Sequence, residues 1–260
     1  MAEEEDVLQV EGLSYRYPNG PLALDDVSFE IQAGERVGLV GPSGAGKSTL
    51  LLHLNGLLPE KIASNGQAAV RVGGLPVTAE HLPTIRQRVG FLFQDPDDQL
   101  FCPTVREDVA FGPLNSGLPV EAVEQRVTES LEAVGLSEFA FRSTLQLSVG
   151  ERKRVCLAGV FASGPSLLAL DEPFSNLDPR ARRRLLDILD EFSGSQIIAS
   201  HDLDLIVAHC SRVIVLDEAQ VRADGTPQAV LSDSALMERH GLEVPSRLKD
   251  VTSGPDAASG

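Results

Sequence analysis

Short apolar runs, separated by polar and glycine-containing segments, occur along most of the chain. The runs at residues 36–40, 89–93 and 167–170 are shorter than a typical helix. Such runs indicate strands that are buried on both faces of a sheet. We expect further strands at residues 7–11, 27–31, 68–72, 196–200 and 212–217.

The spacing of apolar residues changes in the middle of the chain. Residues 105–111, 120–134 and 151–162 carry apolar side chains at helical intervals. These three helices predict a helical block, at about residues 95–165, that is inserted in an α/β domain.

The last quarter of the chain has a weaker pattern. Two short helices are expected at about residues 226–249. Residues 250–260 are rich in Gly, Ser, Ala and Pro, so we expect a disordered tail. The main domain is therefore expected to span residues 1–245.

The sequence GPSGAGKST at residues 41–49 matches the phosphate-binding pattern G-x-x-x-x-G-K-[ST]. It follows an expected strand and precedes a helical segment that ends at Gly56. In this context, glycines and a helix N-terminus turn backbone N–H groups towards a phosphate chain. We expect nucleoside triphosphate binding, with Lys47 on the β- and γ-phosphates and Ser48 on Mg²⁺.

Four polar side chains stand directly after other expected strands. They are Gln94, the pair Asp171 and Glu172, and His201. Ligands of open α/β sheets bind at the carboxyl ends of the strands. Beside a phosphate-binding loop we expect Asp171 to hold Mg²⁺, Glu172 to polarise the attacking water, and His201 to contact the γ-phosphate.

Two further signals are weak when taken alone. Ser148 and Gly150 stand where the helix at 151–162 begins, and free N–H groups there can meet an anion. An ordinary Ser N-cap explains the same residues. Tyr17 lies in a turn and can stack on an adenine ring, but a Tyr near a turn is more often a half-buried packing residue.

Composition narrows the possible functions. The 260 residues are 42% hydrophobic and 23% charged, which is ordinary for a globular protein. The net charge of −16 disfavours nucleic acid as a partner. Apolar runs fall far short of the ~20 residues that span a bilayer, so work on a membrane would need a membrane-embedded partner. Three widely spaced Cys without a C-x-x-C pair indicate free thiols in a reducing cytosol.

In this order, the motifs resemble the ATP-binding cassette (ABC) ATPase family. The resemblance covers residues 7 to about 245. It rests on the phosphate-binding loop together with LSVGE at 147–151, LLALDE at 167–172, SNLD at 175–178 and His201. It implies an α/β P-loop NTPase (RecA-like) core with an antiparallel β subdomain and an inserted α-helical subdomain.

The resemblance also implies a role for each site residue. Contacts to ATP are expected from Tyr17, Gly41, Pro42, Ser43, Gly44, Ala45, Gly46, Lys47, Ser48, Thr49, Ser148 and Gly150. Ser48, Gln94 and Asp171 are expected at Mg²⁺, and Glu172, His201 and Gln94 in catalysis. Two chains are expected to close head to tail, so that Ser148 and Gly150 complete the site of the other chain.

A narrower resemblance is to the ATPases of energy-coupling factor and cobalt/nickel transporters. It rests on FQDPDDQLF at 93–101 and TVREDVAFGP at 104–113. It implies a vitamin or Co²⁺/Ni²⁺ importer, a second identical or paralogous ATPase, an integral membrane coupling protein and a substrate-binding membrane protein. The chain is then expected in the cytoplasm, peripheral on the cytoplasmic face of the cell membrane.

The sequence departs from the usual signature LSGGQ at two positions. Val149 replaces a Gly, and Glu151 brings a negative charge towards a polyanion. Separately, Asp95, Asp97 and Asp98 predict a groove for a basic helix of the membrane partner, although a solvated acidic turn explains the cluster equally well.

Other classes of protein share part of this pattern. A soluble P-loop kinase or GTPase has the loop but does not explain the signature-like helix start. The ATPase of another ABC importer or exporter shares every motif except the narrower set.

Overall fold

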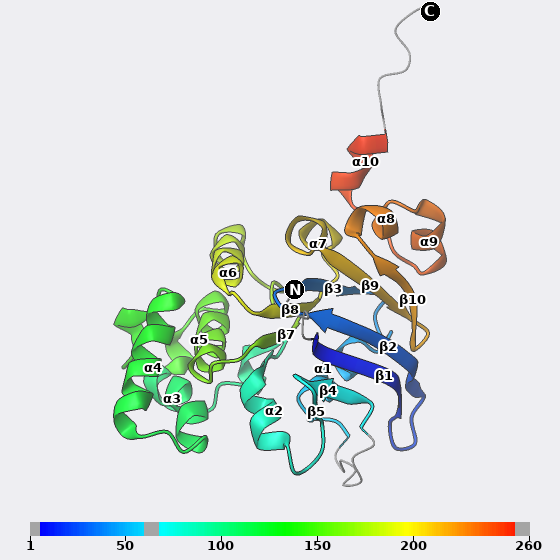
Figure 1. Ribbon diagram of the computed structural model, residues 1–260. Coiled ribbons are helices and arrows are strands. Elements are labelled where there is room, and N and C mark those ends of the chain that lie inside the picture. The colour runs from blue at the N-terminus through cyan, green and yellow to red at the C-terminus, as the bar shows by residue number, and fades with distance from the viewer. Residues whose placement is uncertain (1–5, 60–67, 253–260) are drawn as a thin grey trace, which may run out of the picture.

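The computed structural model describes residues 6–59 and 68–252, and it contains two sheets (Figure 1). The strands are β1 Asp6–Arg16, β2 Leu22–Gln32, β3 Arg36–Val40, β4 Val70–Val72, β5 Leu75–Pro76, β6 Val89–Leu92, β7 Leu167–Asp171, β8 Ser195–Ala199, β9 Arg212–Asp217 and β10 Gln220–Gly225. The helices are α1 Lys47–Leu54, α2 Leu82–Arg88, α3 Val105–Asn115, α4 Val120–Ala133, α5 Val149–Ala162, α6 Pro179–Glu191, α7 Leu203–His209, α8 Pro227–Leu231, α9 Ser234–Arg239 and α10 Ser246–Thr252. Short 3₁₀ turns lie at η1 Pro96–Asp98, η2 Ser137–Phe139 and η3 Thr144–Gln146.

The larger sheet carries the carboxyl-end residues that the sequence singled out. Its strand order is β10-β9-β3-β8-β7-β6, and all pairs are parallel except the edge pair β10–β9. Because β3, β7 and β8 are neighbours, the ends of these strands meet at one edge of the sheet.

Both faces of this sheet are buried, which explains its near-continuous apolar strands. In β7, Leu168 and Leu170 pack on one face and Leu167 and Ala169 on the other. The first face is covered by the helical block and by α6 to α8, and the second by α1 and the smaller sheet.

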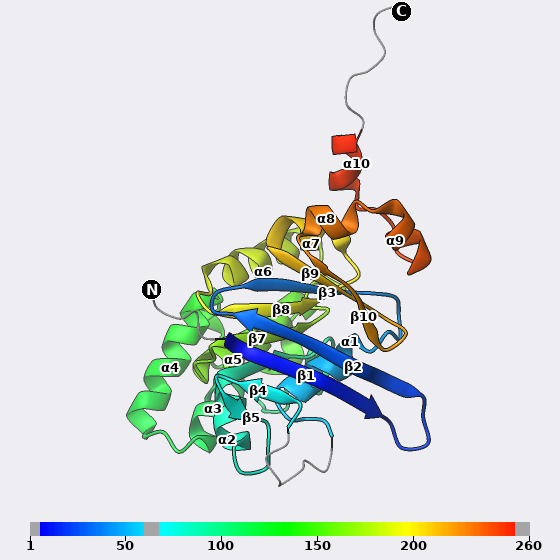
Figure 2. The same ribbon diagram turned by 45° about the vertical axis from the view of Figure 1, so that its right-hand side comes forward.

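The smaller sheet is antiparallel, with strand order β2-β1-β4-β5. Helix α1 lies between the two sheets and buries Leu50, Leu51 and Leu54 in their shared core. Figure 2 shows the long β1–β2 hairpin crossing in front of the larger sheet. The hairpin therefore brings the turn after β1 close to the start of α1.

The predicted helical block forms from α3, α4 and α5, which pack on one another at one side of the molecule (green in Figure 1). Helix α3 begins with a capping box in which Thr104 and Glu107 bond to each other's backbone N–H groups. The fold class and the parallel α/β core agree with the sequence analysis.

The C-terminal segment forms three short helices instead of two, and α10 runs to Thr252, three residues into the predicted tail. The rest of that tail lies outside the described residues. In the part of the chain that the structure describes, no helix is long and apolar enough to cross a membrane. Cys102, Cys156 and Cys210 are free thiols, as predicted.

Candidate nucleotide-binding and catalytic site

The phosphate-binding loop joins β3 to α1 in a conformation that requires glycine. Gly41 has φ 153°, and a Cβ there would lie 1.9 Å from the carbonyl oxygen of Leu216. Gly46 has φ 106°, and its Cβ would lie 2.4 Å from the carbonyl oxygen of Ala23. Strand β9 and the β2 segment thus press on the loop, and only glycine fits at these positions.

Lys47 is buried at the start of α1. Its ammonium donates to the carbonyl oxygens of Gly41, at 2.7 Å, and Pro42, at 3.0 Å. Burial lowers the pKa of Lys47, while the carboxylates of Glu172 and Asp171 raise it. The ammonium is therefore held at the loop and faces both acidic side chains.

Asp171 ends β7 and is also buried. It accepts a hydrogen bond from the Ser48 hydroxyl. Burial raises the pKa of Asp171, and the Ser48 hydrogen bond and the Lys47 charge oppose that rise. One carboxylate and one hydroxyl thus form an oxygen pair beside the loop.

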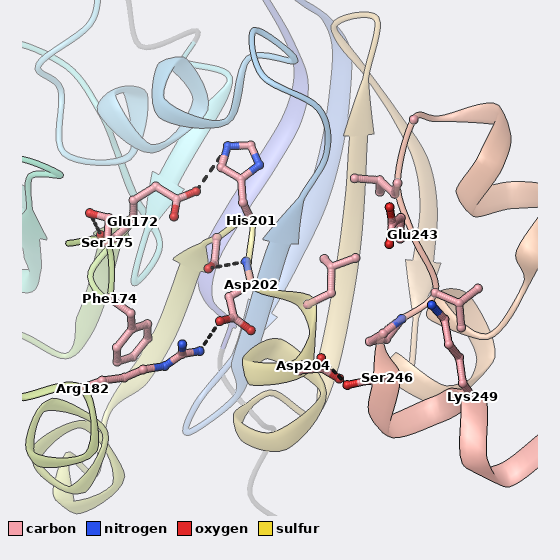
Figure 3. Close-up of a pocket in the computed structure, with 16 residues that line it drawn as sticks. Glu172, Phe174, Ser175, Arg182, His201, Asp202, Asp204, Glu243, Ser246 and Lys249 are labelled. Carbon is pink, nitrogen blue, oxygen red and sulfur yellow. Dashed lines mark hydrogen bonds and ion pairs between the residues drawn. The ribbon is translucent and has the colours of Figure 1, made fainter. Parts of the chain in front are cut away.

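Glu172 follows with φ +45°, in the left-handed region that few residues other than glycine adopt. Its Oε1 atom is buried and has no hydrogen-bond partner among the described residues. His201 Nε2 lies 3.5 Å from this atom (Figure 3). Burial and Lys47 lower the pKa of His201, which keeps the ring neutral at neutral pH.

These residues line one cleft of about 410 Å³. Of the residues predicted at the site, the lining includes Tyr17, Ser43, Gly44, Ala45, Gly46, Lys47, Ser48, Thr49, Gln94, Asp171, Glu172 and His201. Tyr17 is anchored there because its hydroxyl lies 3.1 Å from that of Thr49 and its ring meets the edge of Tyr15. Residues from five separated segments of the chain therefore meet at one place.

Ser148 and Gly150 lie elsewhere, in a second cleft of about 350 Å³ that α5 forms with the start of α6. Among the described residues, this cleft shares no lining side chain with the first. A Cβ at Gly150 would lie 2.9 Å from that of Ala181, so the approach of α6 requires a glycine here. Within one chain, the signature does not reach the phosphate-binding loop.

The two unusual signature residues stand in the first turn of α5. Val149 is the first residue of α5, where a β-branched side chain is tolerated. Glu151 folds back on Ser148 in a capping box, and its carboxylate accepts from both the backbone N–H and the hydroxyl of Ser148. These hydrogen bonds lower the pKa of Glu151. Its negative charge thus stays directly beside the Ser148 hydroxyl.

Glu172 and His201 also border a third cleft of about 740 Å³ (Figure 3). Its far wall is α10, which is attached to α7 because Asp204 accepts from the Ser246 hydroxyl, at 2.6 Å, and from the Arg247 backbone N–H, at 2.9 Å. No sequence pattern marks Asp204, because its partners lie more than 40 positions away in a segment without a motif.

Asp95, Asp97 and Asp98 do not line the groove next to them, and their contact with a membrane partner stays a prediction. Asp95 caps η1, Asp97 forms an ion pair with Arg152, and Asp98 is exposed. The groove between the larger sheet and the helical block, of about 330 Å³, is instead mainly apolar. Its wall includes Leu57, Phe93, Phe101, Phe111 and Val160.

Comparison with known proteins decides the family. Residues 24–175 match the family model described as ABC transporter. The chain belongs to this family. A putative ABC transporter ATP-binding protein of Gloeobacter violaceus is 50% identical over 93% of this chain and 98% of its own length. EcfA of Methanothermobacter thermautotrophicus, an energy-coupling factor transporter ATP-binding protein, is 46% identical over 92% of this chain and 77% of its own length.

Solved structures agree with this family. CbiO1 of Clostridium perfringens, part of the ABC transporter complex CbiONQ, matches with a TM-score of 0.77 at 33% identity, covering 96% of this chain and 100% of that chain. The ATP-binding cassette MJ0796, solved as a dimer with ADP and Pi, matches with a TM-score of 0.72 at 25% identity, covering 85% and 98%. The chain is an ABC ATPase that binds and hydrolyses ATP, and the kinase and GTPase alternatives are set aside.

Proposed function

We propose that this ABC ATPase powers an energy-coupling factor type importer for a vitamin or for cobalt or nickel ions. Support comes from the likeness to proteins named EcfA and to CbiO1 of the CbiONQ complex. The alternative is the ATPase subunit of another ABC importer or exporter. In either case, the chain would lie in the cytoplasm, peripheral on the cytoplasmic face of the cell membrane.

The observation that carries the mechanism is the separation of the two half-sites. The phosphate-binding loop and the signature line different clefts, although both carry groups suited to a triphosphate. Two copies, or this chain and a paralogue, facing each other head to tail would bring each loop against the signature of the other. Each ATP would then be held by both chains.

In this arrangement, the loop N–H groups of residues 41–49 and the start of α1 bind the phosphates. The Lys47 ammonium turns from its carbonyl partners to the β- and γ-phosphates. Tyr17 offers its ring to the adenine. Ser148 and Gly150 of the second chain add a hydroxyl and a backbone N–H at the γ-phosphate.

The residues at the cleft fit a magnesium ion. The hydrogen-bonded pair of Ser48 and Asp171 supplies a hydroxyl and a buried carboxylate, and Gln94 lines the same cleft. Oxygen ligands of this kind suit Mg²⁺, which binds proteins through few side chains and the substrate phosphates. When bound, the ion would neutralise charge on the phosphates.

Glu172 has the properties of a general base. Its buried, unpartnered Oε1 is available to accept a proton from water at the γ-phosphate. Neutral His201, 3.5 Å away, can donate to the same region and orient the carboxylate. Loss of the γ-phosphate after hydrolysis would remove the contact shared by the two chains and open the dimer.

The apolar groove is the proposed docking site for the membrane coupling protein. Phe101 and Phe111 meet edge to face at its rim and are 65% and 44% exposed. Aromatic side chains this exposed on an acidic surface are typical of a protein interface. The groove also borders the segment after Gln94, which links it to the nucleotide cleft.

Co-purification from detergent-solubilised membranes, with mass spectrometry of the bound proteins, tests this proposal. An energy-coupling factor importer predicts an integral coupling protein and a small substrate-binding membrane protein. Recovery of a solute-binding-protein-dependent permease or of an exporter would favour the alternative. Phe101→Ser with Phe111→Ser should release the membrane proteins, whereas Val120→Ser, at an exposed position outside the groove, should retain them.

A further inference from the structure

Lys153 is a buried cation for which the proposed mechanism has no role. It lies on α5, five positions after Ser148, and its side chain is only 1% exposed. Its ammonium donates to the carbonyl oxygens of Glu172, at 3.0 Å, and Pro173, at 3.1 Å, and to the Ser175 hydroxyl, at 3.0 Å. The three donors of the ammonium thus have three acceptors.

All three acceptors belong to the turn that carries the catalytic glutamate. Ser175 also donates its hydroxyl and its backbone N–H to the Glu172 carbonyl, at 2.9 and 3.1 Å. This turn holds Glu172 at φ +45°. A non-glycine residue stays in such a conformation only where its surroundings hold it there.

Helix α5 therefore serves two sites. Its first turn carries Ser148 and Gly150, which the proposed dimer presents to the second chain. One turn later, Lys153 holds the backbone of Glu172 in its own chain. A shift of α5 when the partner's γ-phosphate is bound would move the ammonium and, with it, the turn that aims the carboxylate.

We propose that Lys153 is a positioning residue that fixes the Glu172 turn and couples the signature helix of each chain to that chain's own ATP site. This inference rests on the dimer proposed above. It adds to the proposed function a physical link between the signature of each chain and the ATP site of the same chain.

The test is steady-state ATP hydrolysis by the full-length chain. Lys153→Met keeps the buried stem but removes the ammonium. We expect kcat to fall about 10- to 100-fold with little change in KM for ATP. The Glu172 carboxylate would no longer be held in position for catalysis, while the phosphate-binding loop stays intact. Lys153→Gln, which keeps two N–H donors, should recover part of the lost kcat and guards against a folding failure of the first variant.

Arg126→Met is the matched control. Arg126 lies on α4 and donates to the carbonyl of Ala162, at 3.1 Å, which is the last residue of α5 and stands nine positions after Lys153. Both substitutions should lower the thermal midpoint of unfolding, but only those at Lys153 should lower kcat. An unchanged kcat in both Lys153 variants, or an equal fall in Arg126→Met, would overturn the positioning role.

The coupling is read from the dependence of rate on ATP concentration. The wild type should give a Hill coefficient above 1, and Lys153→Met should bring it close to 1. A lower kcat with an unchanged Hill coefficient would overturn the link between sites. Failure of the proposed dimer is distinguishable, because the wild-type rate per chain would then not rise with protein concentration.

Discussion

Ser148 donates its hydroxyl to a carboxylate oxygen of Glu151 across 2.7 Å, within the capping box that begins α5. The group proposed to meet the γ-phosphate is thus engaged by an anion of its own chain. To bind the partner's ATP, the hydroxyl must leave this carboxylate, and the negative charge must stay close to the phosphates.

This relationship predicts the effect of Glu151→Gln. The amide oxygen can still cap the helix, while the negative charge that repels the γ-phosphate is removed. The protein concentration for half-maximal ATP hydrolysis should fall several-fold, with little change in the thermal midpoint. Glu107→Gln alters the equivalent capping box of α3 and should leave hydrolysis unchanged. Weaker hydrolysis in Glu151→Gln would contradict this explanation.

Glu172→Gln tests the assignment of the base. The variant should bind ATP as the wild type does but lose turnover about 10²- to 10⁴-fold, because the amide cannot accept the proton of the attacking water. Size-exclusion chromatography with ATP should show a stable dimer. Wild-type turnover in this variant would exclude Glu172 as the base.

Asp171→Asn tests the magnesium site. In the wild type, ATP with Mg²⁺ should raise the thermal midpoint more than ATP with a chelator does, because the ion bridges the protein and the phosphates. In the variant this difference should disappear, and hydrolysis should be lost. A full magnesium-dependent shift in Asp171→Asn would place the ion on other residues.

The pKa of Asp204 makes the attachment of α10 sensitive to acid. Hydrogen bonds from the Arg247 N–H and the Ser246 hydroxyl hold this pKa below the ordinary aspartate value. A depressed folded-state pKa stabilises the contact above the unfolded value, about 3.9, and the contact is lost as pH falls through the folded value. The Arg247 amide signal in NMR should titrate with a midpoint below 3.9.

Asp204→Asn should make amide exchange at residues 246–249 faster at neutral pH. Asp233→Asn, which alters the N-cap of α9, should not change it. An Arg247 midpoint at or above the ordinary aspartate value would contradict the assigned hydrogen bonds.

Motifs predicted which side chains meet in one cleft, because each motif lies in a short stretch of chain. The phosphate-binding loop, Asp171 and His201 follow buried strands, and parallel neighbours bring such strand ends together. Strand β10 was not predicted, because its residues are half-exposed and polar and give no apolar run.

The sequence pattern did not predict contacts between side chains that lie far apart in the chain. The acidic groove was predicted from three neighbouring aspartates, yet Asp97 pairs with Arg152, 55 positions away. Lys153 and its acceptor Glu172 are 19 positions apart and lie on separate elements. No local spacing marks such pairs, because only the packing of α5 against the end of β7 brings them together.

The most direct test of the shared site is complementation between two inactive variants. Lys47→Ala destroys the phosphate-binding loop, and Ser148→Ala removes the signature hydroxyl. A mixed head-to-tail dimer has one doubly altered site and one intact site. At a protein concentration where the wild type hydrolyses ATP, an equal mixture should regain up to roughly a quarter of the wild-type rate, since half of randomly formed dimers are mixed. A mixture no more active than the sum of its parts would contradict a site built from two chains.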